Sequence, residues 1–135
     1  MMPNMIIVNG GGGTEVAGAL DAVSSLLLQS VTPLAEPERT YMLLFPFPLQ
    51  AGTSFTRLRG KGGFVVSASW AGQRLSGAVE VEAEVGGSCR FLLPQNATLT
   101  VLDVTSGGVG ATVPSTFEAR MLEFSTVAGH HYVLR

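Results

Sequence analysis

The stretch FVVSASW at residues 64–70 is followed by the turn AGQ at residues 71–73 and by a second segment, RLSGAVEVEAEV, at residues 74–85. A short glycine-containing turn between two such segments predicts a β-hairpin. In the second segment three glutamates alternate with aliphatic residues, namely Glu80, Glu82 and Glu84 with Val79, Val81, Ala83 and Val85. Because neighbouring side chains of a strand point to opposite faces, this period of two predicts one buried face and one solvated face.

Similar short segments continue to the end of the chain, separated by glycine and proline. Strands are predicted at residues 55–59, 89–93, 98–104, 116–124 and 131–134, with turns or loops at residues 60–63, 86–87, 94–96 and 107–110. Several short strands at such spacing are typical of an antiparallel sandwich. The predicted fold class is therefore mainly β, an antiparallel β-sandwich of short strands with one N-terminal helix.

The segment before these strands has a different pattern. Four glycines at residues 10–13 are followed by Thr14, a suitable N-cap, and by the acidic Glu15 in the first turn of a helix. Apolar residues then recur at helical spacing, which predicts a helix from residue 15 to about residue 29. Residues 1–39 are predicted as a glycine-rich segment, a helix and a linker, and residues 40–135 as the β-sandwich domain.

The composition limits the classes of partner. Hydrophobic residues make up 46% of the 135 residues and charged residues only 13%, so we expect a partner or a second copy to cover some apolar surface. The net charge is −2 and the basic residues are scattered, which argues against a nucleic-acid partner. No segment is long enough to span a membrane and no signal peptide is visible, so the localisation is cytoplasmic only by default.

Few residues suggest chemistry. Cys89 is the single cysteine and lies in a predicted strand, so we expect a buried, inert thiol and no intrachain disulfide. His130 and His131 would point to opposite faces of a strand, so no metal site is predicted. The glycines at residues 10–13 match neither the dinucleotide-binding nor the P-loop pattern, and no cofactor is predicted. The three glutamates are expected on a solvated face, and no catalytic residue is predicted.

Segments spread over about the last two thirds of the chain resemble the α-L-fucosidases of glycoside hydrolase family 95. That family has a Leu-Pro-Ala-Leu-Pro segment, then Gly-Leu-Arg-Ala-Arg-Gly-Gly-Phe, then a strand that ends in tryptophan before an Asp-Gly-Lys-type turn. The counterparts here are LFPFP at residues 44–48, RLRGKGGF at 57–64, WAGQ at 70–73, GSCR at 87–90 and FSTVAGHHY at 124–132.

The resemblance implies the family's C-terminal β-sandwich, detached from the helical barrel that carries the catalytic residues. In the family the barrel performs an inverting hydrolysis of α-linked fucose, with an acid far upstream of this region. Residues 7–14 resemble the family's Ile-Asp-Gly-Asn-Phe-Gly segment, but the aspartate falls on Val8 or Asn9, and neither is a carboxylate. The resemblance therefore implies no catalytic activity for the chain on its own.

Three hypotheses of function follow. The first is a non-catalytic interaction or structural module that forms a homo-oligomer, or binds a partner protein, through the N-terminal helix and the apolar segment from Leu43 to Leu49. The second is the C-terminal fragment of a glycoside hydrolase that acts on α-L-fucosides with a separate barrel. The third is a carbohydrate-binding module in which Trp70, Tyr41 and Tyr132 stack on sugar rings, an alternative to a place for Trp70 in the core.

Overall fold

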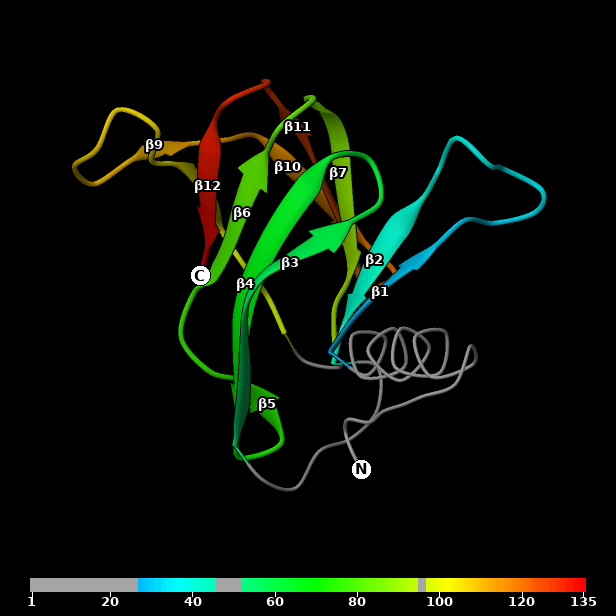
Figure 1. Ribbon diagram of the computed structural model, residues 1–135, viewed down its shortest axis with the longest axis horizontal. Helices are drawn as coiled ribbons and strands as arrows, with labels where there is room; N and C mark the ends of the chain where they lie inside the picture. Colours follow the sequence, from blue (N-terminus) through cyan, green and yellow to red (C-terminus); the bar gives the residue numbers. More distant parts are fainter. Residues whose placement is uncertain (1–26, 46–51, 95–96) are drawn as a thin grey trace, which may run out of the picture.

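The computed structural model describes residues 27–45, 52–94 and 97–135, which form two β-sheets (Figure 1). One sheet has the order β1-β2-β7-β11-β10, with β1 (Leu28–Val31), β2 (Tyr41–Leu44), β7 (Gly87–Leu92), β11 (Met121–Thr126) and β10 (Ser115–Glu118). The other has the order β3-β4-β6-β12-β8-β9, with β3 (Thr53–Gly60), β4 (Phe64–Ala71), β6 (Val79–Ala83), β12 (His131–Leu134), β8 (Val101–Asp103) and β9 (Ala111–Thr112), and β5 (Arg74–Leu75) pairs with β4.

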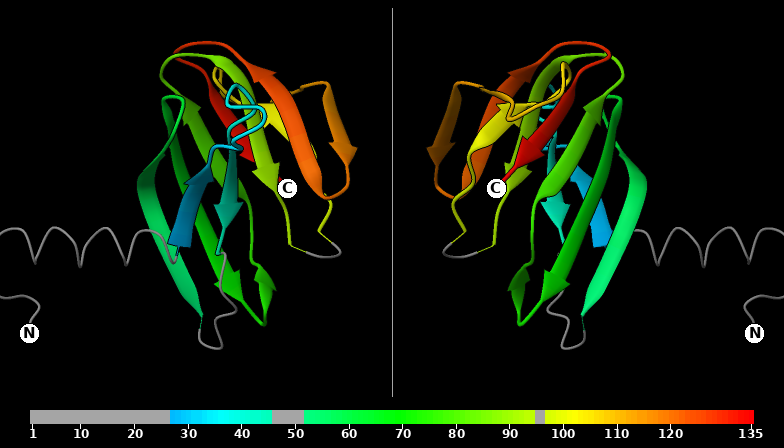
Figure 2. Two further views of the ribbon diagram at one scale, coloured as in Figure 1. Left: turned by 90° about the vertical axis from the view of Figure 1, so that its right-hand side faces the viewer. Right: turned by 90° about the vertical axis from the view of Figure 1, so that its left-hand side faces the viewer.

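A single hydrophobic core takes side chains from both sheets, which lie against each other in Figure 2. Met42, Phe91 and Leu122 of the five-stranded sheet are fully buried, as are Val66 and Val81 of the seven-stranded sheet. The strands pair antiparallel except β2 and β7, which are parallel over two residue pairs. The mainly β fold predicted from the spacing of the turns is therefore confirmed.

The predicted N-terminal helix lies mostly outside the described residues, and its last part is wrong. Leu28 and Gln29 belong to β1, where they pair antiparallel with Leu44 and Leu43 of β2. The strand also places Leu28 in the core, and this tertiary contact outweighs the helical spacing of the apolar residues. No helix in the described part is long and apolar enough to cross a membrane.

The central hairpin is present and its alternation is confirmed. In β6 the aliphatic side chains are buried and the glutamates are not: Val79, Val81 and Ala83 against Glu80 and Glu82. The second segment of the hairpin forms two strands instead of one, since Gly77 adopts a φ of 71° between β5 and β6. Val85, predicted on the buried face, is 71% exposed because β6 ends at Ala83.

The single strand predicted at residues 116–124 is wrong. The chain instead forms β10 and β11, joined by Ala119 and Arg120 with φ values of 51° and 68°. Two residues with positive φ match the twist of the flanking strands, as in a type I′ hairpin turn. Glycine and asparagine are the usual residues there, so Ala119 and Arg120 carry no sequence signal for the turn. The strand predicted at residues 98–104 is also shorter and comprises β8 alone.

Cys89 lies on the inward face of β7. Its side chain is fully buried, and burial raises the pKa of the thiol because the thiolate would lose its hydration. The predicted burial of Cys89 is confirmed.

Candidate functional site

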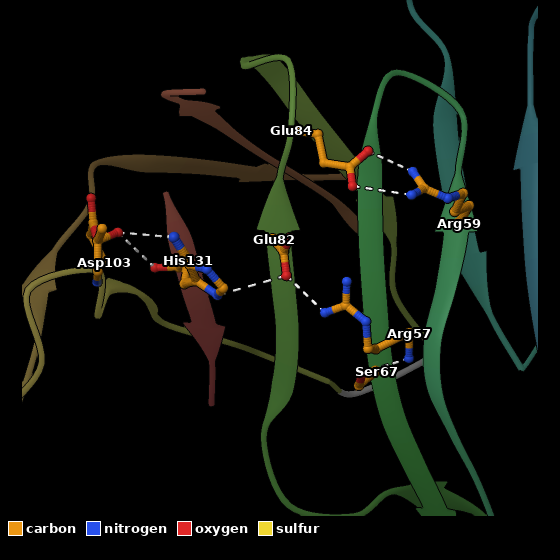
Figure 3. A network of polar contacts seen from close by, with 8 residues as sticks. Arg57, Arg59, Ser67, Glu82, Glu84, Asp103 and His131 are labelled. Carbon is orange, nitrogen blue, oxygen red and sulfur yellow. Dashed lines mark hydrogen bonds and ion pairs between the residues drawn. The ribbon is translucent and has the colours of Figure 1, made fainter. Parts of the chain in front are cut away.

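Charged side chains form a row across the outer face of the seven-stranded sheet (Figure 3). Arg57 Nη1 lies 2.8 Å from Glu82 Oε2, and Arg59 Nη1 lies 2.5 Å from Glu84 Oε1. His131 of β12 lies on the other side of Glu82, with its Nδ1 4.0 Å from the same Oε2. Each arginine thus reaches across β4 to a glutamate in or just after β6, and Glu82 is shared between Arg57 and His131.

A β-bulge in β3 makes this row possible. With strict alternation Phe55, Arg57 and Arg59 would share one face, and two arginines would point into the core. The register between β3 and β4 shifts between Phe55 and Leu58, Arg57 adopts a φ of 58°, and its N–H donates to Ser67 Oγ at 2.9 Å. The extra residue lets both Phe55 and Leu58 pack on the core while the arginines face outward. Alternation within β3 does not predict this bulge, because it is a shift in the pairing of β3 with β4.

The ion pairs favour the charged form of each partner. The hydrogen bond to Glu82 raises the pKa of Arg57, and the same bond lowers the pKa of Glu82. The hydrogen bond to Glu84 likewise raises the pKa of Arg59. A catalytic acid needs a carboxyl pKa raised toward the working pH, and the pKa of Glu82 is shifted in the opposite direction. Glu82 is therefore not suited to donate a proton. The ion pairs of the row can instead hold neighbouring strands together and bind polar groups.

A shallow depression of about 300 Å³ lies beside this row. Arg57, Ser67 and Glu80 line it with polar groups, and Val65 and Val133 contribute apolar surface. Val65 is 4% exposed although it is registered with the outward-facing Glu82. The depression offers donors and acceptors above a small apolar floor, and its polar groups come from four strands, because His131 of β12 also lines it.

A second polar cluster joins the end of β8 to the turn before β12. Asp103 Oδ1 accepts hydrogen bonds from the Thr105 N–H at 2.9 Å and from the Thr105 hydroxyl at 2.5 Å, and Asp103 Oδ2 lies 2.7 Å from His130 Nδ1. The Thr105 Oγ1 in turn accepts from the His131 N–H at 2.9 Å. The Thr105 bonds and then His130 hold the pKa of Asp103 at about 2, below its ordinary value. The Asp-x-Thr pattern at residues 103–105 is a sequence signal for this turn.

We expect Asp103 to contribute to the loss of stability in acid. A carboxyl whose pKa is lower in the folded than in the unfolded protein stabilises the fold above its ordinary pKa, and this contribution is lost as the pH falls toward the folded value. On the order of 1 kcal/mol should therefore be present at about pH 5 and lost toward about pH 2, after allowance for solvent screening. Urea unfolding of the wild type and of Asp103→Asn measures it, since asparagine keeps an acceptor for Thr105 but does not titrate. An equal stability difference at both pH values would contradict the prediction.

The three aromatic residues predicted to stack on sugar are not brought together. Trp70 is 7% exposed, with its ring centroid 5.5 Å from that of Phe45. Tyr132 is 2% exposed, and its hydroxyl accepts a hydrogen bond from the Val127 N–H at 2.8 Å. Tyr41 is half-buried on β2, in the other sheet. The alternative interpretation, in which Trp70 fills the core, is confirmed.

The two histidines have different surroundings, as their adjacent positions predict. His130 lies in the turn before β12 and contacts Asp103, whereas His131 begins β12 and faces Glu82. Within residues 27–45, 52–94 and 97–135 no group of three or more His, Cys, Asp and Glu side chains could hold a metal ion. Val8 and Asn9, on which the resemblance would place an aspartate, lie outside the described residues.

The segments at residues 57–64 and 124–132 meet at one end of the sheets, where glycines permit close packing. A Cβ on Gly60 would lie 2.2 Å from Met42 Sδ, and a Cβ on Gly63 would lie 2.5 Å from Val85 Cγ2. The Gly63 carbonyl accepts from the Glu84 N–H at 2.8 Å, and the Gly129 N–H donates to the Ala83 carbonyl at 2.7 Å. Residues 57–64 and 124–132 are thus joined through the end of β6, and their glycines have structural roles.

The chain matches no known protein-family model and no curated protein.

Proposed function

We propose that the chain is a non-catalytic β-sandwich interaction module of the kind found at the C-terminus of family 95 α-L-fucosidases, and that it acts by association. Two features support this. Arg57 and Arg59 are paired with glutamates whose charge they neutralise. The glycines of the segment at residues 57–64 are accounted for by packing and backbone conformation. Neither feature requires a substrate.

An apolar row on the outer face of the five-stranded sheet carries the proposal. Leu43 of β2 is registered with Leu92 of β7, and Leu92 with Met121 of β11, so the three side chains lie side by side. All three are half-buried. Tyr41, registered with Val31 of β1, extends the same face. One ion pair, Arg90 with Glu123, lies beside the row on this face, whereas the outer face of the other sheet carries the longer charged row of Arg57, Arg59, Glu82 and Glu84. The apolar row therefore favours the five-stranded sheet as the contact face.

The proposed occupant of this face is a second copy of the chain. A two-fold axis brings the same surface of both copies together, and the row is self-complementary because its three central side chains are uncharged. Gln29 is registered with Leu43 at one end of the row and Glu118 with Met121 at the other, which gives the apolar centre a polar rim.

The segment from Leu43 to Leu49 enters this proposal only in part. Leu44 and Phe45 are 3% and 4% exposed in the core of the same chain, so their side chains are not open to a partner. Leu43 faces outward in the row, and residues 46–49 lie outside the described residues. The contact is therefore proposed for the sheet face rather than for the whole segment.

The test is the solution mass of the purified chain by light scattering, combined with a glycan array and a screen of fucosyl substrates. We expect a dimer that neither binds nor hydrolyses the sugars, because the apolar row gains burial only on association. A monomer at every concentration would overturn the self-association. Hydrolysis of a fucoside would support the glycoside hydrolase fragment instead, and glycan binding without turnover would support a carbohydrate-binding module.

Matched variants locate the contact. Leu92→Lys places a charge at the centre of the row and should weaken the dimer by about tenfold or more. Thr56→Lys adds the same charge at an exposed position of β3, in the other sheet, and should leave the dimer intact. Circular dichroism checks that both variants fold. A dimer that tolerates the first variant as well as the second would exclude this face.

A further inference from the structure

A groove of about 900 Å³ lies at a place that neither the charged row nor the apolar row occupies. One wall is formed by the turn between β4 and β5 and by β5 itself, and the other by residues 94 and 97–99 of the segment before β8. Arg135, which follows β12, completes the lining. The volume is that of a site for a small organic molecule.

The arginines without an ion-pair or hydrogen-bond partner among the described side chains line this groove. Four arginines form ion pairs with glutamates, namely Arg39 with Glu36, Arg57 with Glu82, Arg59 with Glu84 and Arg90 with Glu123. A fifth, Arg120, donates from Nε to the Leu93 carbonyl at 2.8 Å. Among the described residues only Arg74 and Arg135 have no side-chain partner, both line this groove, and none of the described residues that line it is acidic. Two positive charges are therefore available to a ligand at one place.

The backbone fixes the positions of both arginines. Arg74 pairs with Ala71 in the ladder between β5 and β4. The Arg135 N–H donates to the Thr100 carbonyl at 3.0 Å, and the Arg135 carbonyl accepts from the Thr100 N–H at 2.7 Å. A guanidinium group presents a planar set of donors that matches two oxygens of a carboxylate or a phosphate. An acidic group that reaches both arginines would gain charge-assisted hydrogen bonds without breaking an existing ion pair.

The rest of the groove is apolar. Leu75, Ala97 and Leu99 line it and are partly buried against the core, and Pro94 and Ala78 add further apolar surface. A bare inorganic anion would leave this surface in contact with water. From this combination we propose that the groove is a binding site for a small organic anion, in which a carboxylate or phosphate meets Arg74 and Arg135 and an apolar body contacts Leu75 and Leu99. The inference is independent of the proposed self-association.

The experiment is an NMR titration of the ¹⁵N-labelled full chain with four probes: phenyl phosphate, benzoate, inorganic phosphate and benzyl alcohol. We expect saturable shifts of the Gly72, Gly77, Thr98 and Leu99 amides with phenyl phosphate or benzoate, and the stronger of the two identifies the acidic group. Inorganic phosphate lacks the apolar body and benzyl alcohol lacks the charge, so each should bind about tenfold more weakly or not at all. The absence of saturable shifts with either organic anion would overturn the proposal.

Three arginine variants separate a site from general attraction to positive charge. Arg74→Gln and Arg135→Gln should each weaken binding of the organic anion by about fivefold or more, because each removes a charge-assisted hydrogen bond. Both side chains are exposed, so both variants should fold. Arg39→Gln makes the same change in the exposed loop before β2 and should leave binding unchanged. Equal weakening by all three variants, or by none of them, would overturn the proposal.

Discussion

Trp70→Ala should lower the free energy of unfolding by about 3–5 kcal/mol, the cost of removing a large buried aromatic side chain. The Trp70 ring packs against Phe45, whose ring centroid lies 5.3 Å from that of Phe55, so the cavity would open inside a cluster of aromatic rings. A domain of this size is stabilised by only about 5–15 kcal/mol in total. The variant should therefore unfold at a much lower urea concentration than the wild type.

Tyr41→Ala is the matched control for this prediction. Tyr41 is also aromatic but is only half-buried, on the outer face of the five-stranded sheet. Its loss removes less buried surface and leaves no enclosed cavity, so we expect about 1 kcal/mol or less. Urea unfolding followed by circular dichroism measures both variants. Similar small effects for the two would show that the Trp70 ring is accessible, and the sugar-stacking hypothesis would then regain support.

Gly86→Ala should lower the free energy of unfolding by about 2–4 kcal/mol. Gly86 has a φ of 87°, which is costly for any residue with a side chain. A Cβ there would also lie 2.9 Å from the Ala128 backbone nitrogen and 3.4 Å from the Thr126 carbonyl oxygen. Because these are backbone atoms, the turn from β6 to β7 and the turn before β12 would have to move apart.

Gly129→Ala measures the conformational part of that cost without the steric part. Gly129 has a φ of 83°, close to that of Gly86, but a Cβ there would meet nothing within 4 Å. We expect only about 1 kcal/mol, the price of the backbone conformation alone. Thermal or urea unfolding of both variants gives the difference. Equal losses would mean that the two turns separate easily and that their packing contributes little to the fold.

Trp70→Ala and Gly86→Ala also test why tryptophan and glycine occur at these positions of the sequence. Trp70 suggested a sugar-stacking surface, yet its ring lies in the core. The glycines around residues 60–63 and 86–87 suggested loops, and several of them allow segments to approach more closely than a Cβ would permit. Packing explains the positions of Trp70 and of these glycines, and the two proposed contact surfaces are formed by other residues.

The mainly β class and the buried face of β6 follow from local sequence patterns. Alternation of Val79, Val81 and Ala83 with glutamates is a local property, because side-chain direction reverses at every residue of a strand. The burial of Cys89 followed from its place in a predicted strand. Each of these features depends on residues close together in the chain.

Features in which distant segments compete or meet depend on the three-dimensional packing of the chain. Leu28 and Gln29 follow a helical pattern but pair with β2, since strand pairing and core contact outweigh local preference. The bulge at Arg57 is needed because Phe55 and Leu58 both reach the core, which alternation forbids. The row of Leu43, Leu92 and Met121 and the groove of Arg74 and Arg135 join residues from separate strands, and no spacing within the sequence predicts such neighbours. Local pattern fixes which face a side chain takes, whereas long-range pairing fixes what lies beside it.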